Sequence, residues 1–219
     1  IHETFGLLAQ DLHMPLFPQG VPPRIWIGNQ TKVPIHFDNV DNVACVVSGE
    51  RKITVYPPSE VQNLYTGPLN NTLADTPISL LPKNPSPEDF PKYAHALEHA
   101  LTAELYPGDA VFIPTIWWHE VEALSDVNIL INYWHGGPLE DPTEYSAFHA
   151  LLHTFMIMQK LPQAKKDAWK HLFDHYAFTQ NGDPGSHIPE PLVGWLGGLP
   201  PEEERALIAQ LQQELGKNN

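Results

Sequence analysis

The chain has 219 residues, a hydrophobic fraction of 42% and a formal net charge of −14. This length fits one domain, or one domain with an appended helical segment. The acidic charge and the lack of any Lys/Arg cluster disfavour nucleic-acid binding, because phosphate backbones are bound by grouped basic side chains. No apolar run is long enough to span a membrane. The single cysteine, Cys45, cannot form an internal disulfide, so we predict a cytoplasmic protein.

The first part of the chain is predicted to be loop-like over residues 1–23 and then rich in short strands. Val, Ile, Thr and aromatic residues dominate four segments that Gly, Asn and Pro interrupt, as in an antiparallel β core. The four segments are RIWIG (24–28), VPIHFD (33–38), NVACVVSG (42–49) and RKITVYPP (51–58).

A less regular stretch separates these strands from the next ones. Residues 59–92 are rich in Pro, Asn and Ser and predict an irregular insertion, with a short helix expected over 91–100. Residues 101–121 and 127–136 then predict two further strand pairs around a Pro-Gly-Asp turn.

The remainder of the chain predicts helices. Apolar residues recur at helical spacing over 143–161 and 164–178. The segment 200–217 begins with prolines and glutamates, which suit a helix N-terminus.

These patterns divide the chain into two predicted parts. We expect a β-barrel core over residues 1–142 and a helical segment over 143–219. Because the first residue is Ile1 rather than methionine, we expect that the N-terminus is truncated and that upstream residues contribute to the fold or the site.

The strand VPIHFD carries a histidine and a carboxylate two positions apart. Residues two apart on a strand point the same way, so His36 and Asp38 are expected on one face, and Val33, Ile35 and Phe37 on the other. An imidazole and a carboxylate so placed can bind one metal ion. The HxD pattern alone is a weak signal for such a site.

A third candidate ligand is His119 in IPTIWWHEV, after an apolar and aromatic strand. Two histidines and one carboxylate on one face of an octahedron form the set used for non-haem Fe(II). That set leaves three positions open, as oxygen chemistry requires. A zinc site would more often be closed by sulfur or further histidines, and this chain has only one cysteine.

Further polar residues are predicted to point into the core beside this set. Arg51 shares a strand face with Ile53 and Val55, and a guanidinium among apolar residues needs an anion, which a carboxylate matches in a bidentate manner. A bound ligand, an internal carboxylate or a position at the strand mouth would each satisfy it. In NILINYWH, Asn132 and Trp134 share a face, and a polar ligand could partner their amide and indole groups.

VPIHFD, NVACVVSGERKITVYPP, LYPGDAVFIPTIWWHEVEAL and NILINYWH occur in this order over residues 24–137. Together they resemble the JmjC, or cupin-8-like, class of Fe(II)- and 2-oxoglutarate-dependent oxygenases, and within it the hypoxia-inducible-factor asparaginyl hydroxylase branch. The resemblance implies a mainly β, double-stranded β-helix (jelly-roll) core with a C-terminal helical segment. It also implies His36, Asp38 and His119 as iron ligands and catalytic residues, Arg51 as the partner of the distal carboxylate of 2-oxoglutarate, and Asn42, Asn132 and Trp134 as co-substrate pocket residues.

Two residues depart from the pattern of that branch. Arg51 stands where lysine is more frequent, and Val33 stands where a threonine hydrogen-bonds 2-oxoglutarate. The upstream tyrosine contact of the branch has no counterpart in this chain. The contacts to 2-oxoglutarate are therefore expected to differ in detail.

The reaction implied by the resemblance uses O₂ and converts 2-oxoglutarate to succinate and CO₂. It hydroxylates a substrate C–H bond, and demethylation results where that bond belongs to an N-methyl group. The implied substrate is a protein or peptide side chain, for which the acidic charge would suit a basic partner. In the hydroxylase branch, C-terminal helices mediate homodimerisation, and the stripe Leu207, Leu211 and Leu215 would suit that role or packing onto the chain's own barrel equally well.

Three other interpretations compete with this one. His95, Glu98 and His99 match the H-x-x-E-H pattern of inverted zinc peptidases, although the distal carboxylate and large helical domain of that class are not visible. A cupin could also bind a metal and act directly on a small chelating substrate. A protein-binding module could keep the fold without turnover, although the complete set of three candidate ligands weighs against it.

Overall fold

The computed structural model describes residues 6, 12–69, 76–136 and 147–216. The chain divides into two compact units, residues 1–153 and 154–219. The boundary predicted between residues 142 and 143 lies outside the described residues and stays a prediction. In the described part of the chain, no helix has both the length and the apolar character needed to cross a bilayer.

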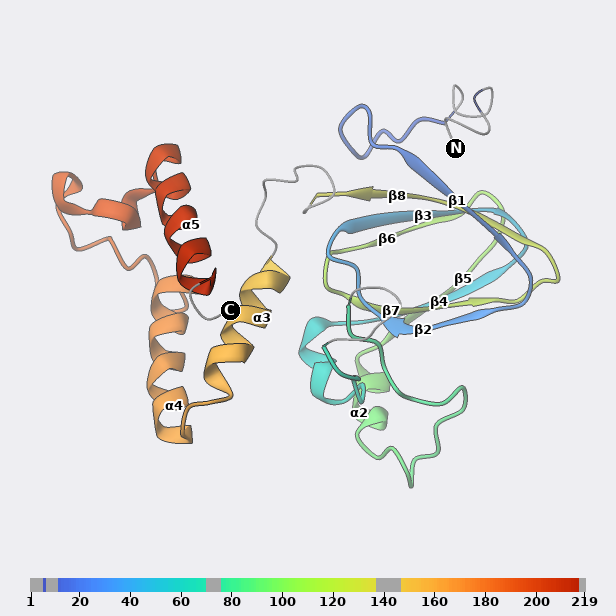
Figure 1. Cartoon of the computed structure of the whole chain (residues 1–219). Helices are drawn as coiled ribbons and strands as arrows, with labels where there is room; N and C mark the ends of the chain where they lie inside the picture. Colours follow the sequence, from blue (N-terminus) through green and yellow to red (C-terminus); the bar gives the residue numbers. More distant parts are fainter. Residues whose placement is uncertain (1–5, 7–11, 70–75, 137–146, 217–219) are drawn as a thin grey trace. The chain divides into compact units, whose positions relative to one another are not determined.

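Two four-stranded antiparallel sheets form the core of the first unit (Figure 1). Sheet A has the strand order β1-β8-β3-β6 and sheet B the order β2-β7-β4-β5, so consecutive strands alternate between the sheets through much of the chain. The predicted mainly β jelly-roll core is thereby confirmed. The strands are β1 Pro23–Gly28, β2 Lys32–His36, β3 Asp41–Ser48, β4 Arg51–Tyr56, β5 Leu101–Leu105, β6 Ala110–Ile113, β7 Trp118–Ala123 and β8 Asn128–His135.

Apolar side chains from both sheets pack together in part of the space between them. Val46 and Ile113 come from sheet A, and Ile53 and Leu105 come from sheet B; all four are buried. The strand faces that carry these four side chains are the inner faces of the barrel.

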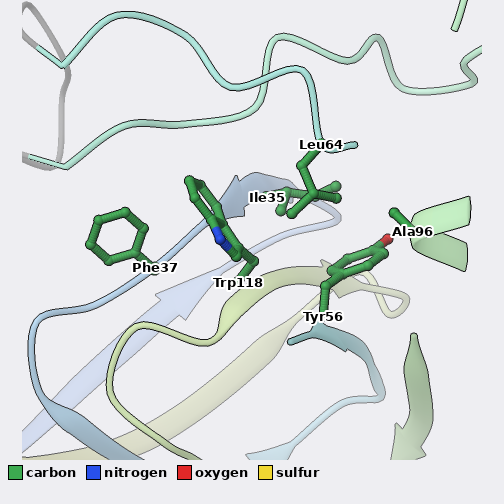
Figure 2. Close-up of a cluster of buried hydrophobic side chains, with 6 residues drawn as sticks. All are labelled: Ile35, Phe37, Tyr56, Leu64, Ala96 and Trp118. Carbon is green, nitrogen blue, oxygen red and sulfur yellow. The ribbon is translucent and has the colours of Figure 1, made fainter. Parts of the chain in front are cut away.

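A second buried cluster lies on the outer face of sheet B. Figure 2 shows its six side chains, three of which come from strands β2, β4 and β7. Phe37 lies edge-on to Trp118, with ring centroids 4.9 Å apart and an interplanar angle of 82°. Phe37 directly follows β2, and Leu64 and Ala96 come from the insertion after β4, which covers this face of the sheet. The six residues are Ile35, Phe37, Tyr56, Leu64, Ala96 and Trp118.

The insertion contains little regular structure among its described residues, as its composition predicts. It begins with a 3₁₀ turn, η1 (Pro58–Gln62), and ends with the short helix α2 (Tyr93–Glu98). Ser79 donates its backbone N–H to the carbonyl of Ile35 at 2.7 Å, which ties the insertion to the end of β2.

The strand β2 contains an irregularity that the alternating pattern did not predict. Val33 lies opposite Val121 and His36 lies opposite His119, so β2 has one residue more than β7 between these pairs. Directly opposite residues share a face of a sheet, and an extra residue of this kind is a β-bulge. Val33 therefore lies on the inner face with His36. Its prediction on the outer face, beside Ile35, was wrong.

Helices dominate the region after the barrel, as predicted. Helix α3 extends from the end of the first unit into the second, α4 follows Pro162, and five residues of π-helix continue α4. None of the described residues of α3, α4 or α5 is buried. The elements are α3 Ala147–Met158, α4 Gln163–Leu172, η3 Phe173–Ala177, η4 Glu190–Leu192, η5 Gly194–Gly197 and α5 Pro201–Gly216.

Candidate metal centre

The structure brings His36, Asp38 and His119 together on the inner face of sheet B. His36 ends β2, Asp38 follows it, and His119 is the second residue of β7. One ligand atom from each residue lies within 4.8 Å of the other two. His119 Nε2 is 3.8 Å from Asp38 Oδ2, and the two imidazole centroids are 4.3 Å apart. This spacing lets all three side chains contact one ion.

Backbone carbonyls fix the orientation of both imidazoles. Nδ1 of His36 is 2.8 Å from the carbonyl oxygen of Pro34, and Nδ1 of His119 is 3.0 Å from that of Trp117. A carbonyl can only accept, so each Nδ1 carries the hydrogen and donates it. In the neutral rings, Nε2 then keeps a free lone pair, which is the form that binds a metal.

The burial of His119 also favours its neutral form. Only 2% of its surface is exposed. Burial, together with repulsion from His36, lowers its pKa from 6.5 to about 4, although Asp38 acts in the opposite direction. At neutral pH the ring is therefore unprotonated and available as a ligand.

A chain of amide hydrogen bonds leads from Asp38 across the inside of sheet A. Asn42 Nδ2 donates to Asp38 Oδ2 at 3.3 Å, and Asn132 Nδ2 donates to Asn42 Oδ1 at 3.1 Å. Trp26 Nε1 then donates to Asn132 Oδ1 at 2.8 Å. Both predicted amides are buried beside the cluster. Trp26 was missed, because the alternation in RIWIG could show which residues share a face but not that this face meets Asn132.

Trp134, the predicted pocket aromatic, lies on the inner face at the same end of the barrel, opposite Asn42. Its indole Nε1 is buried and has no hydrogen-bond partner among the described residues. The guanidinium of Arg24 lies 4.4 Å from the centroid of its ring, within range of a cation–π interaction. Sequence reasoning missed Arg24 as well, since the contact joins residues 110 positions apart in the chain.

Arg51 is buried on the same inner face, deeper in the barrel. It lies opposite Ala123 of β7, whereas Val55 of the same strand lies opposite His119. Four residues of strand separate the two levels, which is about 13 Å. Arg51 is 8% exposed, its Nε has no hydrogen-bond partner among the described residues, and burial lowers its pKa. A partner for this charge is therefore missing from the described protein atoms.

The bulge in β2 places Val33 between these two levels. Val33 lies opposite Val121, which in turn lies opposite Ile53, halfway from His119 to Arg51. On sheet B, the three side chains placed at this level are apolar. A ligand extending from the three-residue cluster to Arg51 would pass a wall without hydrogen-bonding side chains at this point.

The donor set fits a non-haem iron. Two imidazole nitrogens and one carboxylate oxygen converge from one side, as the 2-His-1-carboxylate set requires, and the orphaned polar atoms of Arg51 and Trp134 lie on inner faces of the same barrel. Among the described residues, no other group of three His, Cys, Asp or Glu side chains could hold a metal. The H-x-x-E-H segment forms no such group: His99 Nδ1 instead lies 2.9 Å from Glu60 Oε1.

A cavity of about 270 Å³ lies on the opposite side of sheet B from the metal cluster. Its walls come from β2, β7 and the insertion, and the ion pair Lys32–Glu120, at 2.9 Å, forms part of it. None of the three cluster residues lines it, so it is separate from the candidate metal centre.

Residues 1–140 match the family described as the cupin-like domain. The chain belongs to this JmjC-type cupin family. Its assignment to the asparaginyl hydroxylase branch stays a prediction.

Among its curated relatives is the lysine-specific demethylase JMJ31 of Arabidopsis thaliana, 32% identical over 58% of this chain and 24% of that protein. HSPB1-associated protein 1 of Homo sapiens is 32% identical over 52% of this chain and 24% of its own length. The tRNA wybutosine-synthesizing protein 5 of Danio rerio is 27% identical over 76% of this chain and 54% of its own. The matched region thus spans about a quarter of the length of the first two relatives.

Proposed function

We propose that this chain is an Fe(II)- and 2-oxoglutarate-dependent oxygenase that hydroxylates a protein or peptide side chain. One observation carries the proposal. The converging His36, Asp38 and His119 share the inner face of sheet B with Arg51, a buried guanidinium whose Nε lacks a partner among the described residues. A metal and a dicarboxylate together would satisfy both features.

Each residue then has a defined task. His36, Asp38 and His119 would hold Fe(II), which, with 2-oxoglutarate and O₂ bound, supplies the oxidising chemistry that releases succinate and CO₂ and hydroxylates a C–H bond. The carbonyls of Pro34 and Trp117 keep both imidazoles turned so that Nε2 faces the ion.

The remaining pocket residues would bind and orient the co-substrate. Arg51 would take the distal carboxylate of 2-oxoglutarate as a bidentate ion pair, which offsets the cost of burying the charge. Asn42 and Asn132 hold each other and Asp38 in place through their hydrogen bonds. Ile53 and Val121, which pack in the apolar cluster between the sheets, would exclude water along the path between the two ends.

The substrate class rests on the family and not on a contact in this chain. One relative is a lysine-specific demethylase and another is named for its association with the protein HSPB1, which favours a protein substrate. The same chemistry demethylates when the C–H bond attacked belongs to an N-methyl group. Hydroxylation is our first choice because the sequence motifs resemble a hydroxylase branch. We also propose that the protein is cytoplasmic.

We also propose that the C-terminal helices form a homodimer interface. Leu211 and Leu215 of α5 are 43% and 47% exposed, and the apolar helix α3 exposes Leu151 and Phe155 by about half. Apolar helix faces of this kind mark interaction sites more often than free surface. Light scattering of Leu211→Glu and Leu215→Glu tests the proposal. The parent is expected at twice the chain mass and the variants at the chain mass; a monomeric parent would refute the interface.

The decisive experiment is an anaerobic titration with Fe(II) and then 2-oxoglutarate, followed by visible absorption. We expect a metal-to-ligand charge-transfer band only when both are present, and its loss in Asp38→Ala. Glu120→Ala is the matched control, since Glu120 follows His119 in sequence but faces the outer cavity. Iron binding without the band would favour a cupin that acts directly on a chelating substrate. No iron binding would favour a non-catalytic interaction module.

A further inference from the structure

The turn between β6 and β7 contains an unusual backbone conformation. Ile116 has a φ of 58°, in the left-handed region that β-branched residues rarely adopt. Trp117 donates its N–H to the carbonyl of Pro114 at 3.1 Å, so Ile116 is the third residue of a β-turn. A positive φ at this position is normally provided by Gly or Asn. The sequence here places isoleucine where the turn favours glycine.

Burial of the Ile116 side chain does not explain its positive φ. Ile116 is 48% exposed and belongs to neither buried cluster. A strained residue persists only where the surrounding structure determines it, and such residues concentrate at functional sites. The explanation must then come from what its backbone contacts.

The backbone of this turn holds both segments that carry the candidate ligands. Ile116 donates its N–H to the carbonyl oxygen of Asp38 at 2.9 Å. The next carbonyl, that of Trp117, accepts the hydrogen bond from His119 Nδ1 at 3.0 Å. On the other side, Thr115 donates its N–H to Asp41 Oδ1 at 2.8 Å. Three consecutive residues thus connect the segment after β2 to the start of β7.

We propose that Ile116 is a positioning residue of the metal centre, whose left-handed backbone fixes Asp38 and His119 relative to each other. The inference rests on the proposed function, because it requires the cluster to bind a metal. The angle φ rotates the chain about the N–Cα bond of Ile116, so an ordinary negative φ would turn the segment that follows relative to the N–H that donates to Asp38. The carbonyl of Trp117 would then move and release the imidazole of His119.

The test is the affinity for Fe(II) of Ile116→Pro, measured anaerobically. Proline fixes φ near −65° and has no N–H, so it removes both the conformation and the hydrogen bond to Asp38. We expect the dissociation constant for Fe(II) to rise at least about tenfold, as for other residues that orient metal ligands. Thr179→Pro is the matched control. Thr179 has a φ of 47° but lies in the C-terminal unit, so its variant should keep the parent affinity within about twofold.

A second variant covers the case in which Ile116→Pro does not fold. Ile116→Gly keeps the N–H and adopts a positive φ without steric cost. Its melting temperature should rise by about 2–4 °C, with the Fe(II) affinity within about twofold of the parent. A lower melting temperature or a large loss of affinity would overturn the proposal, because the strain or the backbone role would then be absent.

The outcomes separate this inference from the function on which it rests. If the parent does not bind Fe(II), the proposed function and the positioning role are both refuted. If the parent binds Fe(II) and a folded Ile116→Pro binds it equally well, only the positioning role is refuted.

Discussion

The two faces of sheet B have opposite characters, although they are made by neighbouring residues of the same strands. On the outer face, Ile35, Phe37 and Trp118 join a buried apolar cluster that the insertion covers. On the inner face, His36 and His119 converge with a carboxylate. One residue along the chain therefore separates a packing role from a chemical one, because side chains of a strand alternate between its faces.

The difference extends to how completely the polar groups are satisfied. The outer face buries the hydroxyl of Tyr56 only with a partner, the hydroxyl of Tyr93 at 2.8 Å. The inner faces of the barrel bury Arg51 and Trp134 with nitrogen atoms that have no partner among the described residues. Buried polar groups are nearly always hydrogen-bonded in stable proteins. This difference supports the proposal that the inside of the barrel binds a ligand, whereas the described hydroxyl pair of the outer face needs none.

The largest expected effect on stability distinguishes two neighbouring residues, one on the outer face of sheet B and one on the inner face. Phe37→Ala removes a buried ring that packs on Trp118, and should lower the free energy of unfolding by about 3–5 kcal/mol. Asp38→Ala, one residue later, should change it by less than about 1 kcal/mol in metal-free protein while abolishing Fe(II) binding. Urea denaturation in the presence of a chelator measures both free energies of unfolding, and an anaerobic Fe(II) titration measures the loss of binding. Similar losses of stability in the two variants would contradict the division between the faces.

A smaller effect on the free energy of unfolding is expected from pH, through His119 on the inner face. The unfolded chain protonates His119 near pH 6.5, whereas the folded protein keeps it neutral down to about pH 4. Between these values the unfolded state binds more protons, so the stability of metal-free protein should fall as the pH falls, by at most about 3 kcal/mol from this residue. Above pH 6.5 the contribution is constant.

Denaturation curves at several pH values, compared between the parent and His119→Asn, isolate this contribution. The variant should lose less stability than the parent between pH 6.5 and pH 4. Equal losses would show that burial does not depress the pKa of His119.

Arg51, at the deep end of the barrel, is expected to affect the co-substrate and not the metal. Arg51→Met should weaken 2-oxoglutarate binding by at least about tenfold, the loss expected for one charge-assisted pair, and leave Fe(II) affinity unchanged. Lys52→Met is the matched control on the adjacent position, which faces the other side of β4. Its effect on both affinities should be negligible. Titration of the charge-transfer band with 2-oxoglutarate measures the difference, and equal effects of the two variants would refute the role of Arg51.

The smallest effect is expected for the hydroxyl pair on the outer face. Tyr56→Phe removes one hydrogen bond to Tyr93 and should lower the free energy of unfolding by about 0.5–1.5 kcal/mol. Tyr93→Phe should cost less than this in the Tyr56→Phe background, because the bond is already lost. Binding of Fe(II) should be unaffected in both single variants and in the double variant. A change in metal affinity would show that the outer face contributes to the site after all.

The sequence alone was enough to predict the strands, the main helices and the three candidate ligands. All of these depend on local periodicity or on short motifs: alternation in VPIHFD, helical spacing after Gly137, and the WWHEV segment that contains His119. The inward position of Arg51 also followed from the alternation of its own strand. Interactions between neighbours in sequence are sufficient to determine these features.

Only the tertiary structure decided the features that depend on how distant strands are paired. The bulge that turns Val33 inward arises where β2 pairs with β7. The paired residues are 83 positions apart in the chain for His36↔His119 and 88 apart for Val33↔Val121, a relation that no local pattern contains. The contacts of Trp26 and Arg24 with Asn132 and Trp134 of β8, and the left-handed Ile116 that connects Asp38 to His119, are of the same kind. Register and turn conformation are set by long-range hydrogen bonds, so the sequence could name the candidate ligands but not the backbone that holds them.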